Sequence, residues 1–293
     1  MTETATTRDG TKLAYRLIQG NGKGRVVLIH SLAMDGGFWD RVAPLLTDHA
    51  DVLTYDCRGH GRSGKPDGPY TVELFADDLA DLLDHVGWRS ATVCGASMGG
   101  TVAVAFAAAY PDRVGALGLF DTTCWYGPEA PAQWAERAQK ALDEGLQGLI
   151  GFQKTRWFSD IFREKNPEIV ERAIAIFLAN DVRCYAETCK MLGAADKRDA
   201  LKEFRMPCAI LVGSEDYATP VAMAKVLEAG IAGSKLEVIE SARHLTPMEV
   251  PEVVAGRIVS LVKAAGRSGA GKDAGRMRSA SGLQLPRAKP RQL

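Results

Sequence analysis

The sequence predicts an α/β fold: a mostly parallel sheet with helices on both faces and a helical cap insertion. Short apolar runs alternate with stretches of helical spacing over most of the chain, as in repeated strand–helix–strand units. Such units build a parallel sheet that is covered by helices. Between about residues 122 and 201 the apolar runs stop and only helical spacing remains, with many aromatic residues. This stretch is therefore expected to form a cap over the active face of the sheet.

The predicted elements begin with an alternating segment that extends to Asn21. Asp9-Gly10 is typical of a hairpin turn, so two short strands open the chain. Arg25 to His30 is a continuous apolar run, as expected for a strand buried on both faces. Further strands are expected at 51–55, 90–94, 114–120, 208–213 and 235–239, and helices at 38–46, 70–86, 98–110, 221–229 and 251–265.

Composition limits the classes of partner. Lys+Arg and Asp+Glu both number 36, and the resulting net charge of zero gives no reason to expect nucleic acid or an anionic membrane as a partner. The N-terminus lacks an apolar signal core, and no apolar run approaches the ~20 residues of a membrane span, so we expect a cytoplasmic protein. The six cysteines form no C-x-x-C pair and are expected to be buried free thiols: Cys57, Cys94, Cys124, Cys184, Cys189 and Cys208.

The C-terminal end differs from the rest of the chain. Residues 267–293 carry seven Arg and Lys against one Asp, a net charge of +6. Their Gly, Ser and Pro content cannot bury apolar area, so we expect the last helix to stop at Gly266 and a disordered basic tail to follow. The predicted organisation is a core in two parts, a cap and a tail, at residues 1–121 and 202–265, 122–201, and 266–293. The oligomeric state is not predicted.

The segment Gly95-Ala96-Ser97-Met98-Gly99-Gly100 is the strongest motif, because its G-x-S-x-G pattern lies between a predicted strand and a predicted helix. The two flanking glycines are needed since no side chain fits where the strand and the helix fold back on each other. The turn would expose the Ser97 hydroxyl and aim the Met98 amide at the group it attacks. A glycine-rich turn that merely holds a serine is the alternative, and the flanking elements disfavour it.

A serine nucleophile needs a base, and the base needs a buried carboxylate. His244 is the predicted base because it lies between the last strand and the final helix. Asp216 is the predicted acid because it follows the strand 208–213, at the edge where parallel sheets place their ligands. Asp121 and Glu215 are competitors for this role. The other histidines are expected at a loop, a sheet edge, a turn and a helix end: His30, His49, His60 and His85.

An oxyanion needs two amide donors. The Met98 amide is one, and the loop after the strand 25–30 should supply the other, with Leu32 the best-placed residue. No metal-ligand spacing or cofactor fingerprint is present, and the chemistry needs neither. The expected partner is a small-molecule ester or lactone.

From Thr7 to Ala265 the chain resembles an α/β-hydrolase with a helical cap, in which the order Ser…Asp…His is the expected one. Within that superfamily it is most similar to the 3-oxoadipate enol-lactonases. Ala33 stands where that group usually has glycine, and Ala96 where leucine is common. The resemblance is carried by Ser31-Leu32 with Met34-Asp35, Phe38-Trp39-Asp40, Tyr55 to Gly61, Gly68-Pro69-Tyr70, Cys94 to Gly100, Trp157-Phe158 with Phe162, and His244-Leu245 before Pro251-Glu252.

The resemblance implies a serine hydrolase that works through an acyl-enzyme on a 3-oxoadipate-type enol-lactone of aromatic-compound degradation. A broad carboxylesterase is an alternative. So is a hydrolase of carbon–carbon bonds in meta-cleavage products, although Leu245 stands where those enzymes usually carry tryptophan. A non-catalytic small-molecule receptor on the same fold is a remote alternative.

The substrates of the lactonase group are anionic, so the resemblance also implies a cationic cap residue, for which Arg156, Arg183 and Lys190 are candidates. An apolar pocket wall with a few polar anchors is what a small-molecule site needs. The predicted substrate-binding residues are Trp125, Trp134, Arg156 and Trp157. The alternative for the three tryptophans is that they only pack the cap helices onto the core.

Overall fold

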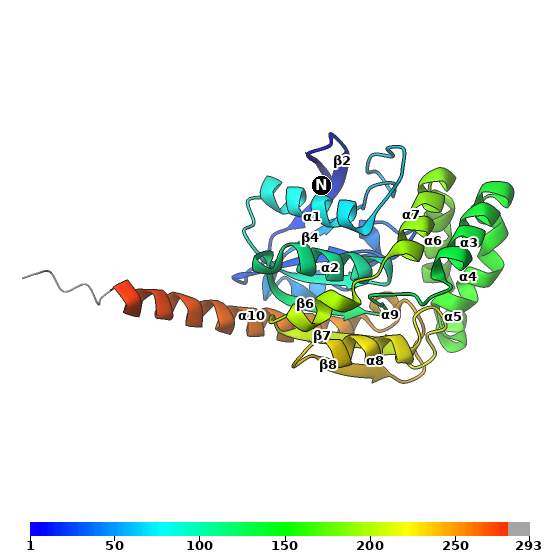
Figure 1. Ribbon diagram of the computed structural model, residues 1–293. Helices are drawn as coiled ribbons and strands as arrows, with labels where there is room; N and C mark the ends of the chain where they lie inside the picture. Colours follow the sequence, from blue (N-terminus) through cyan, green and yellow to red (C-terminus); the bar gives the residue numbers. More distant parts are fainter. Residues whose placement is uncertain (281–293) are drawn as a thin grey trace, which may run out of the picture.

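A computed structural model describes the backbone of residues 1–280 and the side chains of residues 1–267. Within these residues the strands form one eight-stranded sheet in the order β1-β2-β4-β3-β5-β6-β7-β8 (Figure 1). The β1–β2 and β2–β4 pairs are antiparallel, and all the other pairs are parallel. The strands are β1 (Glu3–Thr6), β2 (Lys12–Ile18), β3 (Gly24–Ile29), β4 (Ala50–Tyr55), β5 (Ala91–Ala96), β6 (Val114–Phe120), β7 (Cys208–Gly213) and β8 (Lys235–Ile239).

The central strands are covered on both faces, because every residue of β5 is buried although alternate side chains point to opposite faces. The helix α2 packs on β5 and β6 and against α1, while α10 packs on β6 and its neighbours. These are the apolar strands and covering helices that the sequence predicts. The helices of this core are α1 (Val72–His85), α2 (Met98–Ala109), α8 (Val221–Gly230), α9 (Thr246–Glu249) and α10 (Pro251–Ala280).

A group of helices lies between β6 and β7 in the chain and at one end of the sheet in space, drawn in green in Figure 1. Their packing is dominated by the contact between α3 and α7. All of them fall within the stretch proposed as the cap. They are α3 (Ala130–Glu144), α4 (Ile150–Trp157), α5 (Asp160–Lys165), α6 (Pro167–Leu178) and α7 (Val182–Ala194).

Two boundaries differ from the sequence prediction. The helix expected at 38–46 is two short 3₁₀ turns, η1 (Gly36–Trp39) and η2 (Ala43–Leu46), with Asp35 capping the first and Pro44 starting the second. The prediction that the last helix stops at Gly266 is wrong, because α10 continues to Ala280 and extends away from the sheet (Figure 1). A glycine inside a helix costs about 1 kcal/mol relative to alanine, which is not enough to end it. The rest of the predicted tail, 281–293, lies outside the described residues.

All six cysteines are free and buried, as predicted. Burial raises the pKa of the Cys189 thiol to about 11 and that of Cys208 to about 12, so these groups stay as inert neutral thiols. None of the helices in the described part of the chain is both long enough and apolar enough to cross a membrane.

Candidate active site

Ser97 lies on the turn between β5 and α2, with φ 53° and ψ −119°. Such a positive φ is strained for a residue with a side chain, and it points the hydroxyl away from the sheet. A Cβ on Gly95 would lie 2.0 Å from the carbonyl oxygen of Gly99, and a Cβ on Gly99 would lie 2.2 Å from that of Ile29. Glycine is therefore required on both sides of Ser97, for the reason that the sequence suggested.

His244 and Asp216 lie in line with the Ser97 hydroxyl. The Nε2 atom of His244 is 2.8 Å from Ser97 Oγ, and its Nδ1 atom is 2.9 Å from Asp216 Oδ2. All three residues are buried, although they come from the loops after β5, β7 and β8. The three residues singled out from the sequence are thus brought together in the hydrogen-bonded order that nucleophilic catalysis needs.

The Asp216 carboxylate is held as an anion. Its Oδ1 atom accepts hydrogen bonds from the amides of Ala218 and Thr219, at 2.7 and 2.9 Å, and Oδ2 accepts from the Thr219 hydroxyl. Burial by itself would raise the pKa of Asp216, but His244 and these amides outweigh it, and the pKa lies below its ordinary value. A carboxylate that stays ionised can fix the His244 ring with Nδ1 protonated and Nε2 free to accept the serine proton.

The two competing carboxylates have other partners. Glu215 forms an ion pair with Arg243, with 3.2 Å between Oε2 and Nε. Asp121 is fully buried at the end of β6, where it accepts from the amides of Gly213 and Thr246 at 3.2 and 3.0 Å. It thereby joins β6 to the two loops that carry Asp216 and His244. Burial and the neighbouring charge of Asp216 raise the pKa of Asp121 well above its ordinary value.

The loop after β3 places Leu32 beside the serine. Ser31, Leu32 and Ser97 line the same pocket, and Ala33 turns the chain with φ +57°. The Ala33 carbonyl accepts a hydrogen bond from Asn180 Nδ2 at 2.8 Å, so the end of α6 holds this turn in place. Met98 opens α2, where backbone N–H groups have no acceptor within the helix. The amides of Leu32 and Met98 stay the proposed oxyanion donors.

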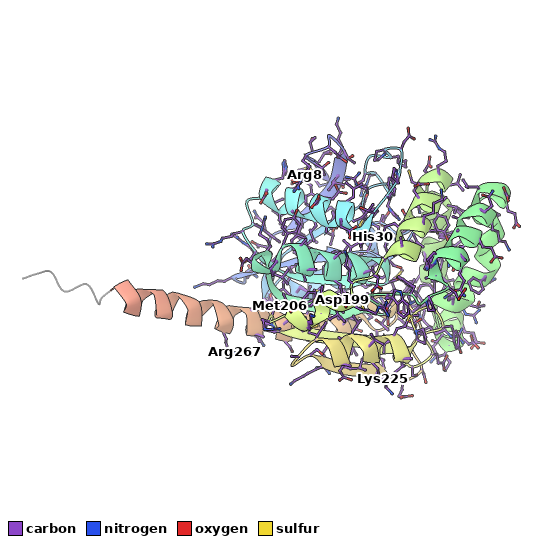
Figure 2. The ribbon with its side chains drawn as sticks, in the orientation of Figure 1. Arg8, His30, Asp199, Met206, Lys225 and Arg267 are labelled. Carbon is purple, nitrogen blue, oxygen red and sulfur yellow. The ribbon has the colours of Figure 1, made fainter. Side chains whose placement is uncertain are left out.

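The other histidines have structural surroundings. His30 is buried inside the molecule, whereas Arg8 and Lys225 lie at its surface (Figure 2). His30 Nε2 accepts from the amide of Cys57 at 2.9 Å, and His60 Nδ1 lies 2.9 Å from the carbonyl of Arg58. Burial lowers the pKa of both rings, that of His60 to about 3. Among the described residues, no group of His, Cys, Asp and Glu side chains is arranged to hold a metal ion.

The pocket above Ser97 encloses about 40 Å³ and is lined by core loops on one side and by the cap on the other. Three of the four predicted substrate-binding residues line it: Trp134, Arg156 and Trp157. Trp125 is outside the lining, where the Arg198 guanidinium stacks 3.6 Å from the centre of its ring. The other two cationic candidates, Arg183 and Lys190, pair with Asp181 and Glu187 and are also outside the lining.

Within the stretch 122–201, sequence reasoning missed three lining residues, Tyr126, Arg137 and Gln153. Arg137 follows Trp134 by three residues on α3, so the two share a helix face, a signal that was available in the sequence. Its Nε atom donates to the Tyr185 hydroxyl at 2.7 Å, and its guanidinium lies 5.1 Å from the centre of the Trp134 ring.

Arg137 and Arg156 form a cationic pair in this pocket. Among the described residues neither guanidinium has a carboxylate within 4.0 Å. Burial and then the positive charge of Arg137 lower the pKa of Arg156, which shows that the two guanidinium groups repel each other. The Nε atom of Arg156 is buried with no hydrogen-bond partner. A pocket with this charge favours an anion, and carboxylates match the guanidinium geometry.

The chain is similar to proteins of one fold family over most of its length. Residues 24–251 match the family model of the alpha/beta hydrolase fold. The 3-oxoadipate enol-lactonase 2 of Acinetobacter baylyi is 33% identical over 261 residues, which cover 89% of this chain and 96% of that protein. The 3-oxoadipate enol-lactonase 1 of the same organism is 30% identical over 247 residues, covering 84% and 91% of the two chains.

Solved structures give the same result. An enol-lactonase from Burkholderia xenovorans LB400 superposes with a TM-score of 0.84 at 32% identity, covering 89% of this chain and all of that one. A malate-bound thermophilic esterase from Thermogutta terrifontis superposes with a TM-score of 0.84 at 30% identity, covering 90% and 99%. The predictions of the fold and of a hydrolase are thereby confirmed. With a family model matched over most of its length and relatives matched almost from end to end, the chain belongs to the alpha/beta hydrolase fold family.

Proposed function

We propose that this protein is a serine hydrolase that opens a carboxylate-bearing enol-lactone of the 3-oxoadipate type through an acyl-enzyme. The observation that carries the proposal is the hydrogen-bonded row of Ser97, His244 and Asp216 in one pocket with two arginines, which have no carboxylate partner among residues 1–267. The row supplies the ester and lactone chemistry, and the arginines favour an anionic substrate. Two relatives named as enol-lactonases, matched over most of their length, support the choice of an enol-lactone as the substrate.

In the first step Ser97 Oγ attacks the lactone carbonyl, and its proton passes to His244 Nε2 over the 2.8 Å hydrogen bond. Negative charge develops on the carbonyl oxygen, which the amides of Leu32 and Met98 are proposed to bind. The protonated His244 is stabilised by the Asp216 carboxylate, 2.9 Å away.

Collapse of this intermediate breaks the ring carbon–oxygen bond. His244 returns its proton to the enol oxygen that leaves, and the enol then tautomerises to the 3-oxo group. Because the substrate is cyclic, both parts of the product stay attached to Ser97 as one acyl chain. A water molecule then gives its proton to His244 and attacks the acyl carbonyl, which releases the ring-opened 3-oxo acid and restores Ser97.

The arginine pair has a defined role in this proposal. The enol-lactone carries a carboxylate arm in addition to the ring, and this arm has to be held while the ring carbonyl faces Ser97. Arg137 is the fixed anchor, because Tyr185 and the Trp134 ring hold its guanidinium. A carboxylate bound there also relieves the repulsion between Arg137 and Arg156.

The test is steady-state hydrolysis of a small panel by the wild type and by Ser97→Ala. The panel holds the enol-lactone of 3-oxoadipate, several neutral aryl esters and a vinylogous diketone of the meta-cleavage type. We expect kcat/KM for the enol-lactone to exceed that for the esters by at least about 100-fold, and to fall by about 10³-fold or more in Ser97→Ala.

Other outcomes would change the proposal. Similar kcat/KM values for all esters and the lactone would indicate a broad carboxylesterase. A preference for the diketone would indicate a carbon–carbon bond hydrolase. Turnover that survives Ser97→Ala would contradict the role given to Ser97, and the absence of any turnover, with no labelling of Ser97 by a phosphonate, would indicate a receptor.

A further inference from the structure

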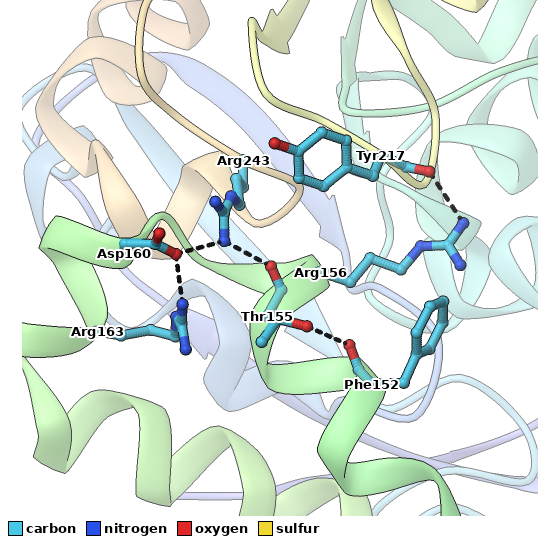
Figure 3. Close-up of a pocket in the computed structure, with 7 residues that line it drawn as sticks. All are labelled: Phe152, Thr155, Arg156, Asp160, Arg163, Tyr217 and Arg243. Atoms are coloured by element: carbon cyan, nitrogen blue, oxygen red, sulfur yellow. Dashed lines mark hydrogen bonds and ion pairs between the residues drawn. The ribbon is translucent and has the colours of Figure 1, made fainter.

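A second cavity lies next to the catalytic pocket and is much larger. The catalytic pocket encloses about 40 Å³, far below the roughly 300 Å³ at which small-molecule sites begin. The outer groove encloses about 450 Å³ and opens to the surface. It is lined by the residues drawn in Figure 3: Phe152, Thr155, Arg156, Asp160, Arg163, Tyr217 and Arg243. Arg156 lines both cavities. The wall between the groove and Ser97 therefore includes this one side chain.

The groove lies where the cap meets the core. Phe152, Thr155 and Arg163 come from the cap helices α4 and α5, while Tyr217 and Arg243 come from the loops that carry Asp216 and His244. The Phe152 ring lies beside Arg156, and the Tyr217 ring lies beside Arg243 (Figure 3). Phe152 and Tyr217 are 57% and 62% exposed. Large exposed aromatic side chains at a junction are typical of a place where a ligand binds or passes.

The charges of the groove leave positive charge in excess. Arg163 and Arg243 share one carboxylate, that of Asp160, and Arg243 also pairs with Glu215. Three arginines thus face two carboxylates, and Arg156 is the one that forms no ion pair within the described part of the chain. In that part, the buried Nε atoms of Arg156 and Arg163 also have no hydrogen-bond partner.

Arg156 is held much more weakly than its neighbour Arg243. Its Nη2 atom donates to the Tyr217 carbonyl at 3.2 Å, and its guanidinium lies 5.0 Å from the centre of the exposed Phe152 ring. By contrast, the Arg243 guanidinium donates to the carbonyls of Thr155 and Phe158 and pairs with two carboxylates. Rotation of the Arg156 side chain costs this one hydrogen bond and the contact with the Phe152 ring, so Arg156 moves more easily than Arg243.

We propose that the outer groove is the entry site for a carboxylate-bearing substrate, and that Arg156 is the gate between this groove and the catalytic pocket. A carboxylate in the groove offers Arg156 a charged acceptor in place of the Tyr217 carbonyl. The guanidinium then leaves the wall with the anion and delivers it toward Arg137, while a neutral ester gives the gate no such partner. That the substrate is an enol-lactone rests on the proposed function, whereas the selection of small carboxylates by the outer groove does not.

The first experiment compares kcat/KM for an anionic substrate, the enol-lactone, with that for a neutral aryl ester. Arg163→Gln removes charge from the groove without reaching the catalytic pocket. We expect the ratio of anionic to neutral kcat/KM to fall about 3- to 10-fold, mainly through KM, and the effect to shrink in 0.5 M salt. Arg183→Gln is the matched control, because Arg183 is an exposed cap arginine outside both cavities, and its ratio should equal that of the wild type.

The gate itself is tested with Arg156→Ala, which opens the wall and removes the cation. We expect opposite changes: kcat/KM rises for the neutral ester and falls at least 10-fold for the enol-lactone. A structural role alone would lower both together, and that result would overturn the gate. An Arg163→Gln ratio equal to that of Arg183→Gln, at equal thermal stability, would overturn the entry site.

Malate inhibition separates this inference from the proposed function. Malate is a small dicarboxylate, and its inhibition constant can be measured on the neutral ester even if the enol-lactone is not turned over. We expect this constant to rise about 3- to 10-fold in Arg163→Gln and to stay at the wild-type value in Arg183→Gln. If the lactone is not hydrolysed but this shift appears, the substrate assignment fails and the entry site stands. If the lactone is hydrolysed and the constant does not shift, only the entry site fails.

Discussion

The sheet core and the helical cap contribute to the site in different ways. The core supplies Ser97, Asp216 and His244, each at the end of a strand and each held by hydrogen bonds to its own loop or to the next residue in the row. The cap supplies Arg137 and Arg156, which have no ion pair with any residue that the structure describes and are held by single hydrogen bonds and aromatic rings. The hydrogen bonds of the core site are thus formed before substrate binds, whereas the guanidinium groups of the cap are still available to bind an anion. In the proposed function the core therefore carries the reaction and the cap selects the substrate.

The two regions are nevertheless tied together at the catalytic loops. The amide of Leu245, next to His244, donates to the Trp157 carbonyl at 3.1 Å. Arg243 donates to two carbonyls of the segment 155–158, and Asn180 holds the turn at Ala33. These bonds attach the cap to the histidine loop and the oxyanion loop. They leave the wall at Arg156 as the more loosely held part.

The largest effect is expected in the core. Asp216→Asn keeps the size of the side chain but removes the charge that stabilises protonated His244 and selects its tautomer. We expect kcat to fall by about 10⁴-fold for anionic and neutral substrates alike. Steady-state kinetics on both substrate types checks this. The loss of kcat should be equal for the two substrate types, because a loss for one type alone would assign substrate selection to the core.

The loss of folding stability at low pH should also arise from residues of the core. Burial, with the charge of His30, lowers the pKa of His60 to about 3 in the folded protein, against about 6.5 when unfolded. The unfolded chain therefore binds more protons between these values, so stability is full above pH 6.5 and is lost as the pH falls toward 3. Each such histidine contributes a slope of up to about 1.4 kcal/mol per pH unit.

His60→Asn retains a donor near the carbonyl of Arg58. It should reduce the slope of the free energy of unfolding against pH by the contribution of up to one proton. Urea unfolding at several pH values measures it. Arg137→Gln in the cap is the comparison, because an arginine stays charged throughout this range and its loss should leave the slope as in the wild type. A slope that is unchanged in His60→Asn would contradict the structural role of the buried pair of rings.

A smaller and selective effect is expected in the cap. Arg137→Gln removes the fixed anchor, and we expect the ratio of anionic to neutral kcat/KM to fall about 10- to 100-fold, as for loss of a charge-assisted hydrogen bond. Lys140→Gln on the same helix α3 is the control, since Lys140 lies outside the pocket and pairs with Glu144. Equal ratios in the two variants would remove Arg137 from substrate binding.

The smallest effect concerns the loop where the core meets the cap. Ala33 has φ +57°, a conformation that costs a residue with a side chain about 1 kcal/mol more than glycine. Ala33→Gly should therefore raise the free energy of unfolding by up to about 1 kcal/mol, while Ala135→Gly on the exposed face of α3 should lower it by about 1 kcal/mol. Denaturant unfolding measures the sign of each change in the free energy of unfolding. If both substitutions lower it, the turn carries no strain.

The sheet core and the candidate catalytic residues could be predicted from the sequence, because their signals are local. Glycines two residues before and after Ser97 follow from the close approach of strand and helix at one turn. Continuous apolar runs identify strands that are buried on both faces. The position of His244 follows from chain order alone, since parallel strands end at one edge of the sheet.

The contacts between the cap and this core could not be predicted from the sequence. Helical spacing shows which face of α3 is apolar, but not that Arg137 and Arg156, from two different helices, would converge above Ser97. It also could not show that Trp125 would pair with Arg198 instead, or that Asn180 would support the turn at Ala33. These contacts join residues that are far apart in the chain, such as Ala33 and Asn180. Packing between such distant segments is set by the three-dimensional fit of side chains, which no local pattern of the sequence encodes.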